Sequence, residues 1–423
     1  MTTRSAPRGA PPTAALESAS DDEIGRAYHT VLELGAGLAL GRRAESLAVF
    51  AGGDRVSLDL EGRLHRAWLD GDSYQRGLDG RVRKVRIGRD TERAKWLEIE
   101  LLAAGEIRPV LTRVTALVRR AAEAAASALG VPDAIAEPLA RAAAWDLERY
   151  ARERARFERV YRPIPILPPD QNRAVVVQFT EGCSYNRCAF CHLYKDVRFR
   201  LRSPEELARH VREVRELFGS TLQLRRGVFL GQANALVVEQ RKLLEALGIV
   251  RAEFGSSREW PIGAFIDSFT KPKTVAELRE LVALGLEGVS LGLESGSAAV
   301  LTGLGKPVEV DAAVELIHAV GEAELRRGII VLIGAGGRRL AGEHTEATVR
   351  AIERMRLGPR DRVYLSPLHV HEGSRYEARM AEDGLDALTP NELAEQAARV
   401  RAELRARGVK CPIALYDIRR FIY

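Results

Sequence analysis

The chain is poor in cysteine, methionine and aromatic residues, with 4 Cys, 3 Met and 6% Phe, Trp and Tyr among 423 residues. Four cysteines, three of them bunched, do not make the disulfide framework of a secreted domain. The chain also lacks a large excess of one charge, because it contains 64 Lys and Arg and 58 Asp and Glu. The resulting net charge of +6 indicates a mixed, mildly basic surface, which does not imply obligate nucleic-acid binding.

Long apolar runs are absent as well. No uninterrupted stretch reaches the about 18 residues that a membrane-spanning helix requires. Residues 1–20 are rich in Ala, Pro, Ser and Arg and lack the apolar core of a secretory signal. These absences predict a cytoplasmic protein with no membrane partner. A hydrophobic content of 46% nevertheless allows a large core, and the length predicts one big domain with a smaller one.

Three of the four cysteines, Cys183, Cys188 and Cys191, lie within nine residues, directly after the apolar run 174–177. Three thiolates on one short loop can bind three irons of a cubane cluster and leave the fourth iron open to a non-protein ligand. An open iron indicates chemistry, because a purely structural site would be closed.

Three other interpretations of this loop remain open at this point. A tetrahedral zinc site needs a fourth ligand, and His192 is adjacent to Cys191, where one backbone seldom aims both side chains at one metal. A two-iron ferredoxin site shares the cysteine spacing but needs a further cysteine, for which Cys411 is the only candidate. Unconnected buried thiols are the third interpretation, which the polar residues between the cysteines disfavour.

The loop resembles the cysteine motif of the radical SAM superfamily, expanded by one residue to Cys-x4-Cys-x2-Cys. Phe190 matches the aromatic residue that this family carries before the last cysteine. The resemblance implies that Cys183, Cys188 and Cys191 hold a [4Fe-4S] cluster whose open iron binds S-adenosylmethionine (SAM). It also implies that the reduced cluster cleaves SAM to methionine and a 5′-deoxyadenosyl radical, which abstracts hydrogen from a substrate.

Past the proline-rich residues 161–169, strand-length apolar runs alternate with helical patterns. Six βα units in a row predict an α/β fold with a partial (β/α)6 TIM-like barrel over 173–385. The cysteine loop follows the first strand, at the end where such barrels carry their chemistry. The predicted strands are 174–179, 227–230, 262–266, 288–293, 329–333 and 362–365, and the predicted helices are 204–217, 239–254, 275–284, 308–320, 343–355 and 390–407.

The remaining residues divide into four parts. We expect a disordered tail at 1–20, an N-terminal mainly helical α+β domain at 21–160, a proline-rich linker at 161–172, and a C-terminal helix and tail at 386–423 that pack on the barrel. In the N-terminal domain we expect helices and only a small β element. The β stretches are 46–51, 54–60 and 82–87, and the long helices are 110–129 and 134–160.

The other strand ends carry residues that the resemblance assigns to SAM. Gly231, Gln232 and Asn234 follow the second strand and resemble the glycine-containing segment that the family places near the methionyl amine. Glu294 and Ser295 lie in a Gly-Leu-Glu-Ser-Gly element found in many members, where the carboxylate would accept hydrogen bonds from ribose or from the amine. Turns and helix caps are the plainer explanation for the glycines and serines.

Two further strand ends carry candidate residues. Gly334 begins a glycine run after the fifth strand, which would let adenine lie against the backbone. His369 and His371 alternate after the sixth strand and are candidates for contact with substrate or a proton. The cations Lys195, Arg198, Arg200 and Arg202 follow the cysteine loop, where they would offset thiolate charge, dock an acidic flavodoxin or simply be solvated.

The resemblance implies a one-electron donor such as flavodoxin or ferredoxin. It does not distinguish a small molecule from a peptide or RNA as the substrate, and it names no catalytic residue beyond the cofactor site. The leading alternative is an iron-sulfur electron-transfer or sensor protein that does not cleave SAM, with Cys411 as a fourth cluster ligand.

Overall fold

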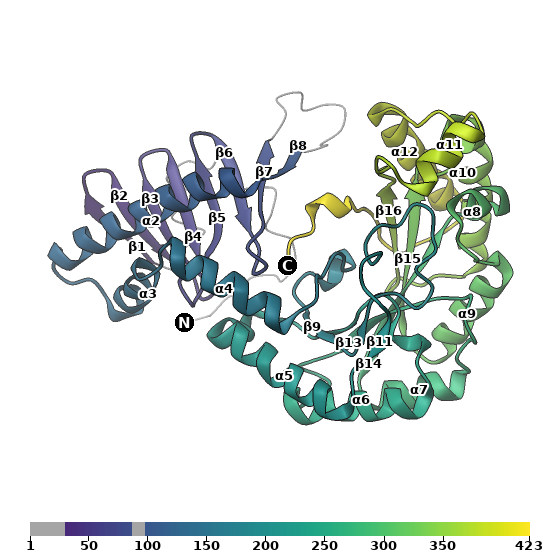
Figure 1. Cartoon of the computed structure of the whole chain (residues 1–423), viewed down its shortest axis with the longest axis horizontal. Coiled ribbons are helices and arrows are strands. Elements are labelled where there is room, and N and C mark those ends of the chain that lie inside the picture. Colours follow the sequence, from purple (N-terminus) through teal and green to yellow (C-terminus); the bar gives the residue numbers. More distant parts are fainter. Residues whose placement is uncertain (1–29, 87–97) are drawn as a thin grey trace, which may run out of the picture. The chain divides into compact units, whose positions relative to one another are not determined.

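The computed structural model describes residues 30–86 and 98–423. The chain divides into two compact units, one of Met1–Arg86 with Glu100–Glu153 and the other of Ile87–Ile99 with Arg154–Tyr423. The tail predicted at residues 1–20 lies outside the described residues. Figure 1 labels the elements of both units.

The first unit contains an eight-stranded sheet in which each strand neighbours the next along the chain. Short hairpins make this meander possible. Asp70 and Gly71 both have positive φ, 51° and 81°, as the two-residue turns of twisted hairpins require. The strands are β1 (Thr30–Gly35), β2 (Leu38–Arg42), β3 (Leu47–Ala51), β4 (Asp54–Leu58), β5 (Leu64–Leu69), β6 (Asp72–Arg76), β7 (Val82–Arg86) and β8 (Glu98–Leu101).

Three helices follow the sheet, namely α2 (Ala104–Ser127), α3 (Asp133–Ala143) and α4 (Leu147–Val160). Helices α2 and α3 lie across one face of the sheet (Figure 1), where Val114 and Leu139 share a core with Leu40 and Val56. The domain is α+β, but its sheet is larger than the small β element that the sequence predicted. These strands are short and mix apolar with polar and small residues, so each strand signal is weak.

The second unit is built on a seven-stranded parallel sheet in the order β17-β16-β15-β14-β13-β12-β9. This confirms the predicted α/β class and partial barrel, and each of the six predicted strands is present. The sheet strands are β9 (Val175–Gln178), β12 (Val228–Gly231), β13 (Ile262–Ile266), β14 (Leu286–Glu294), β15 (Arg326–Ile333), β16 (Arg362–Pro367) and β17 (Ile413–Leu415). A separate antiparallel pair, β10 (Thr180–Glu181) with β11 (Arg200–Leu201), closes the base of the loop that carries the three cysteines.

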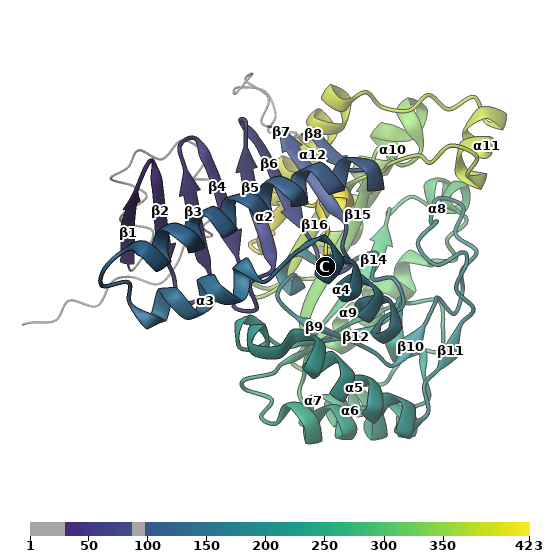
Figure 2. The ribbon, with the colours of Figure 1, turned by 60° about the vertical axis from the view of Figure 1, so that its left-hand side comes forward.

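Helices α5, α6 and α7 run along the outside of the sheet in both views of the ribbon (Figures 1 and 2). The six predicted helices are present, and α8 and α11 are additional short ones. The helices are α5 (Pro204–Phe218), α6 (Gln240–Phe254), α7 (Val275–Ala283), α8 (Ala298–Leu304), α9 (Val310–Glu322), α10 (Gly337–Arg354), α11 (Arg375–Glu382) and α12 (Pro390–Ala406). In the described part of the chain, none is both long and apolar enough to cross a bilayer.

The segment predicted as a linker is packed against the barrel. The Tyr161 hydroxyl donates a hydrogen bond to the carbonyl of Val176 in β9 (2.8 Å), and the Tyr416 hydroxyl donates to the carbonyl of Leu167 (2.7 Å). The Tyr423 hydroxyl accepts from the Val176 amide (2.8 Å). Residues 161–172 and the C-terminal tail therefore meet beside β9, an edge strand of the sheet.

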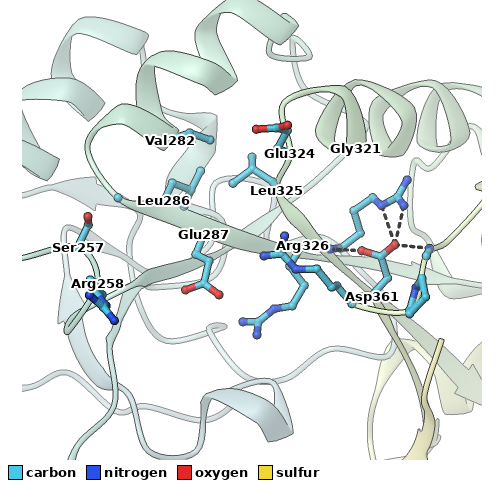
Figure 3. Close-up of a pocket in the computed structure, with 15 residues that line it drawn as sticks. Ser257, Arg258, Val282, Leu286, Glu287, Gly321, Glu324, Leu325, Arg326 and Asp361 are labelled. Atoms are coloured by element: carbon cyan, nitrogen blue, oxygen red, sulfur yellow. Dashed lines mark hydrogen bonds and ion pairs between the residues drawn. The ribbon is translucent and has the colours of Figure 1, made fainter.

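At the amino-terminal ends of the strands, Asp361 ties β15 to β16 (Figure 3). Its carboxylate accepts from the Arg327 amide (2.8 Å), the Arg327 guanidinium Nε (3.0 Å) and the Gly358 amide (2.6 Å). The Asp361 residue is only 3% exposed. Removing one partner of such a buried pair leaves the other charge without compensation.

We expect Asp361→Ala to lower the free energy of unfolding by about 3–5 kcal/mol, because the Arg327 guanidinium would remain buried and unpaired. Urea unfolding of the purified protein measures the change. Glu324→Gln, at an exposed carboxylate of the same pocket, is the matched control and should shift stability by less than about 0.5 kcal/mol. Equal stability of Asp361→Ala and the parent would contradict this role.

Candidate active site

A cavity of about 230 Å³ lies at the carboxyl-terminal ends of the parallel strands. Residues from the ends of β13, β14, β15 and β16 and from the loop after β9 line it. Apolar and aromatic side chains dominate the wall, and they include Tyr185, Phe190, Phe265, Phe269, Ile330 and Leu332. Such a wall with few polar groups is typical of small-molecule and cofactor sites.

A larger pocket of about 640 Å³ lies at the opposite, amino-terminal end of the sheet (Figure 3). Its lining residues in the described part of the chain include neither cysteine nor histidine. In barrels of this kind the amino-terminal end serves stability and the carboxyl-terminal end serves chemistry. The smaller cavity is therefore the candidate active site.

Cys183, Cys188 and Cys191 all line this cavity, and Cys411 does not. Cys411 is fully buried just before β17, and burial and the nearby Asp361 raise the pKa of its thiol. Asp361 marks the amino-terminal end of the sheet, so Cys411 lies at the end away from the other three cysteines. The alternative in which Cys411 supplies a fourth cluster ligand does not agree with this placement.

The three thiols share a cavity without forming a compact single-ion site. Among residues 30–86 and 98–423, no three His, Cys, Asp or Glu side chains are grouped so that they could hold one metal ion. Burial raises the pKa of Cys188 to about 12 and also raises that of Cys191. Metal coordination therefore has to displace protons from these thiols.

The cysteine loop is anchored to the carboxyl-terminal end of α8. The Ala189 amide donates to the carbonyl of Leu304 (2.8 Å), and the Tyr185 hydroxyl donates to the carbonyl of Gly305 (3.1 Å). Gly305 adopts a left-handed conformation with φ of 62° as the C-cap of α8, which glycine tolerates best. Both acceptors are carbonyls at the end of α8, where carbonyls have no partner within the helix. The end of α8 therefore anchors the cysteine loop.

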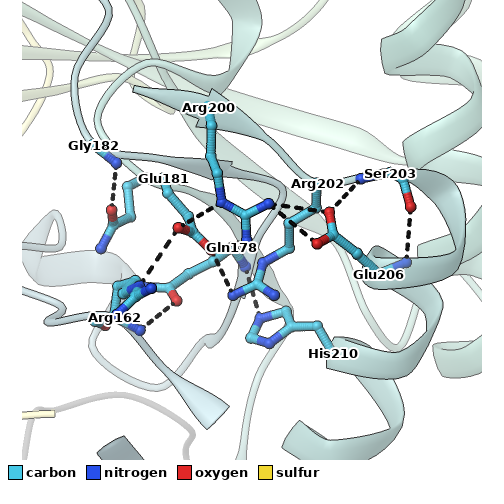
Figure 4. Close-up of polar contacts among 10 residues, drawn as sticks. Arg162, Gln178, Glu181, Gly182, Arg200, Arg202, Ser203, Glu206 and His210 are labelled. Carbon is cyan, nitrogen blue, oxygen red and sulfur yellow. Dashed lines mark hydrogen bonds and ion pairs between the residues drawn. The ribbon is translucent and has the colours of Figure 1, made fainter. Parts of the chain in front are cut away.

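The base of the loop is held by an ion-pair cluster around Glu181 (Figure 4). This buried carboxylate accepts from Arg200 Nε (2.9 Å) and Nη2 (2.8 Å), and it pairs with Arg202 at 3.0 Å. The Gly182 amide next to it donates to Gln232 Oε1 (2.7 Å). Two of the cations predicted after the cysteine loop therefore hold its base.

Lys195 supports the same loop from outside. Its ammonium donates to the carbonyls of Asn186 (2.9 Å) and Cys188 (3.2 Å). The Asn186 side-chain amide in turn donates to the carbonyl of Tyr194 (2.8 Å). The loop backbone is thus fixed on both sides, as a preorganised ligand set requires.

A sequence model described as the radical SAM superfamily matches residues 177–352. Residues 177–352 form a radical SAM domain. The match begins at the penultimate residue of β9 and ends in α10, so it includes the cysteine loop and the ends of β13, β14 and β15 that line the cavity. A search of curated protein sequences gave no significant match.

Several solved structures are similar to this radical SAM chain. Coproporphyrinogen III oxidase HemN from Escherichia coli is 14% identical, with 60% of this chain and 56% of that chain covered and a TM-score of 0.43. The radical SAM methyltransferase TsrM from Kitasatospora setae is 15% identical, with 60% and 58% covered and a TM-score of 0.41. Methylornithine synthase PylB is 16% identical, with 70% and 81% covered and a TM-score of 0.38. The chain spans a little over half the length of the first two structures.

Radical SAM proteins are enzymes whose cofactors are a [4Fe-4S] cluster and SAM, and the donor set of this chain fits that pair. Three thiols face one cavity, and the fourth cysteine of the chain lies at the other end of the sheet. Three thiolates leave one iron of a cubane open, and the adjoining cavity offers the space and polar groups that a ligand of that iron needs.

Six of the ten predicted site residues line the cavity, namely the three cysteines, Phe190, Asn234 and Glu294. The other four, Gly231, Gln232, Ser295 and Gly334, are not among its lining residues. The Asn234 side-chain amide donates to Asp267 Oδ2, and Asp267 also lines the cavity. The predicted residues therefore lie at strand ends around the cavity, but only some of their side chains line it.

The four remaining residues have structural partners. Gln232 holds the base of the cysteine loop, as described above, and Gly231 ends β12 just before it. The Gly334 amide donates to Gln396 Oε1 of α12 (2.8 Å), and a Cβ added at Gly334 would lie 2.5 Å from Leu393 Cδ2. Helix α12 therefore occupies the space beside this glycine.

Lys306 is a cavity residue that the sequence did not reveal. Its ammonium lies 2.5 Å from Glu294 Oε1 and donates to the carbonyl of Gly292 (2.6 Å). Burial lowers the pKa of Lys306, but the Glu294 carboxylate and the Cys188 thiol raise it, and the net shift is upward. Lys306 therefore remains charged. Gly305 turns the chain after α8 and so brings the next residue, Lys306, to the cavity. No pattern in the sequence indicates this placement.

Three histidines also line the cavity. The rings of His192 and His371 have centroids 3.6 Å apart, and His369 Nε2 lies 3.1 Å from Asp417 Oδ1. The predicted pair His369 and His371 thus lies at the site. Asp417 comes from the C-terminal tail, as do the lining residues Tyr416 and Ile418, which were not predicted because strand β17 that positions them is only three residues long.

Ser295 is fully buried against His344 beside the cavity. His344 Nε2 lies 2.9 Å from the carbonyl of Leu332 and therefore carries the proton, so Nδ1 accepts from the Ser295 hydroxyl at 2.8 Å. Burial lowers the pKa of His344 from 6.5 to about 4. The folded protein therefore keeps this imidazole neutral where the unfolded chain would protonate it.

We expect the free energy of unfolding to fall as the pH is lowered from 6.5 towards 4. In that window the unfolded state binds more protons at His344 than the folded state does, so acid favours unfolding. By pH 4.5 this histidine alone should account for a loss of about 2.5 kcal/mol. Urea unfolding at pH 7 and pH 4.5 tests this against His344→Gln, which should show a smaller loss. Equal pH dependence of the two proteins would contradict it.

Proposed function

We propose that this protein is a radical SAM enzyme in which Cys183, Cys188 and Cys191 hold a [4Fe-4S] cluster. The observation that carries the proposal is the convergence of these three thiols, without Cys411, on one cavity at the carboxyl-terminal ends of the strands. When bound, the reduced cluster supplies one electron for the cleavage of SAM, and the radical formed abstracts hydrogen from a substrate. A flavodoxin or ferredoxin is the proposed electron donor.

The chain's own residues have three tasks in this proposal. The apolar wall excludes water, which matters because a reactive radical must meet substrate before solvent. Glu294 and Lys306 form a buried pair beside the cysteines, and we assign them to the polar end groups of SAM. Asn234 and Asp267 are held in place by each other and by Thr270, whose hydroxyl donates to Asp267 Oδ1 (2.7 Å); they are candidates for the ribose hydroxyls.

The cavity also bears on the substrate. Among the described residues that line it, the one lysine is already paired with Glu294, and there is no arginine. A phosphate or carboxylate placed deep in this cavity would find no unpaired Lys or Arg, and buried charges require such partners. We therefore assign the reacting part of the substrate to an uncharged group, which the histidines at this site would contact.

Anaerobic reconstitution with iron and sulfide tests the proposed function. The expected result is a brown protein that forms 5′-deoxyadenosine from SAM with dithionite, and faster with a reduced flavodoxin. A protein that binds iron and sulfide but never cleaves SAM would support the electron-transfer or sensor alternative instead.

A further inference from the structure

The end of β16 carries a buried hydroxyl that the assignments above leave unused. Ser366 lines the cavity, is 6% exposed and pairs in register with Leu332 of β15, another lining residue. Its hydroxyl forms no hydrogen bond with any residue that the structure describes. Buried polar groups in proteins are nearly always hydrogen-bonded. A molecule bound in the cavity would supply the partner that the protein does not.

The wall of this part of the cavity is apolar. Four lining residues form or pack on one buried cluster, namely Ile166, Phe265, Ile330 and Tyr416. The Tyr416 amide donates to the carbonyl of Leu365 (2.8 Å), which places Tyr416 beside the end of β16. Its hydroxyl already donates to the carbonyl of Leu167, as described above. A molecule that reaches Ser366 therefore packs mainly against apolar side chains.

His369 follows Ser366 at the same strand end and adds a second polar group. Its Nε2 lies 3.1 Å from Asp417 Oδ1. Asp417 is 4% exposed, and its carboxylate also accepts from the Arg419 amide (3.0 Å) and from Arg419 Nη2 (2.6 Å). Burial raises the pKa of Asp417, but the hydrogen bonds from His369 and Arg419 lower it by more, so the net shift is downward.

The ionised Asp417 fixes the position of the imidazole proton. An ionised carboxylate only accepts hydrogen bonds, so Nε2 of His369 carries the proton and Nδ1 of the neutral ring is an acceptor. Within the described part of the chain, no group donates to this Nδ1. His369 is half-buried and lines the cavity, so a bound molecule can donate a hydrogen bond to it.

We propose that Ser366 and His369 bind the substrate, and that the substrate is a neutral, largely apolar compound that donates a hydrogen bond to His369. An anion would place its lone pairs against the unprotonated nitrogen of that ring. Asp417 is a positioning residue, because it orients the imidazole without lining the cavity. The inference rests on the proposed function for the reaction that follows binding.

A matched series of small ring compounds tests the proposal. 2-Naphthol donates a hydrogen bond, 2-methoxynaphthalene has the same apolar body but no donor, and 2-naphthoate is an anion. We expect 2-naphthol to bind about 2- to 10-fold more tightly than 2-methoxynaphthalene, which is the effect of one hydrogen bond. We expect 2-naphthoate not to bind, because its charge would be buried without a cation. Ligand-observed NMR titration of the full-length protein, before reconstitution and after reconstitution with SAM, measures the affinities.

Substitutions locate the binding. Ser366→Ala removes only the hydroxyl and should weaken both neutral compounds about 2- to 10-fold, whereas His369→Phe should abolish the preference for 2-naphthol over 2-methoxynaphthalene. Asp417→Asn no longer fixes the imidazole proton, so it should reduce this preference and move part of the proton to Nδ1, which nitrogen NMR of the labelled histidines detects. Glu372→Gln, at an exposed residue that does not line the cavity, is the matched control and should bind like the parent.

Three outcomes would overturn the proposal. They are no binding of 2-naphthol, equal affinities of 2-naphthol and 2-methoxynaphthalene for the parent, and a preference for 2-naphthol that His369→Phe leaves unchanged. An unchanged proton position in Asp417→Asn would overturn the positioning role of Asp417. Thermal melting of each variant separates lost binding from lost folding. Because binding is measured without SAM cleavage, failure to form 5′-deoxyadenosine would overturn the proposed function and leave this binding test intact.

Discussion

Cys183→Ala, Cys188→Ala and Cys191→Ala are each expected to abolish SAM cleavage and to reduce bound iron and sulfide towards background after anaerobic reconstitution. The three thiols are the only cysteines that line the cavity, and a cubane held by two thiolates would have two open irons instead of one. Iron and sulfide analysis, the absorbance of the brown cluster and 5′-deoxyadenosine formation measure the effect.

Cys411→Ala is the matched control for these variants. Its thiol is fully buried next to the residues around Asp361, at the opposite end of the strands. We expect the variant to keep its cluster and its rate of SAM cleavage, with only a modest loss of stability from the removed side chain. Loss of the cluster in Cys411→Ala, or its full retention in any of the other three, would contradict the three-cysteine site.

The barrel was predictable from sequence because its strands are buried on both sides. Fully buried parallel strands appear as continuous apolar runs, and Val175–Gln178 and Ile262–Ile266 have that form. The sheet of the first unit was largely missed because its strands are short and mix apolar residues with arginines and small residues. β17 was missed because three residues carry too little pattern to separate a strand from a loop.

The residues that line the cavity were predictable where they lie close together in the sequence or directly follow a strand. Cys183, Cys188 and Cys191 are close in sequence, and Glu294 directly follows a long apolar strand. Lys306 and Asp417 reach the site through a helix turn and through the C-terminal tail, so their role follows only from the folded structure. The position of Gly334 also follows only from the folded structure. The glycine run that begins there predicts backbone open to a flat ligand, but α12 covers it.

We expect the ion pair of Lys306 and Glu294 to act both in stability and in SAM binding, and substitutions of the two residues can separate these roles. Lys306→Met should lower the free energy of unfolding by about 3–5 kcal/mol, because it leaves the buried Glu294 carboxylate without a cation. The double variant Lys306→Met with Glu294→Gln removes both charges and should recover most of that loss. Urea unfolding of the parent, the two single variants and the double variant measures the coupling between the two side chains.

SAM binding should respond differently from stability. If the pair also holds the polar end groups of SAM, the double variant will fold like the parent, yet its affinity for SAM will be at least about 10-fold weaker, because charge-assisted hydrogen bonds to the ligand are lost. Calorimetric titration of the reconstituted proteins with SAM measures this. If the double variant binds SAM as tightly as the parent, the ion pair only stabilises the end of β14. Asn234 and Asp267 would then be the residues that recognise SAM.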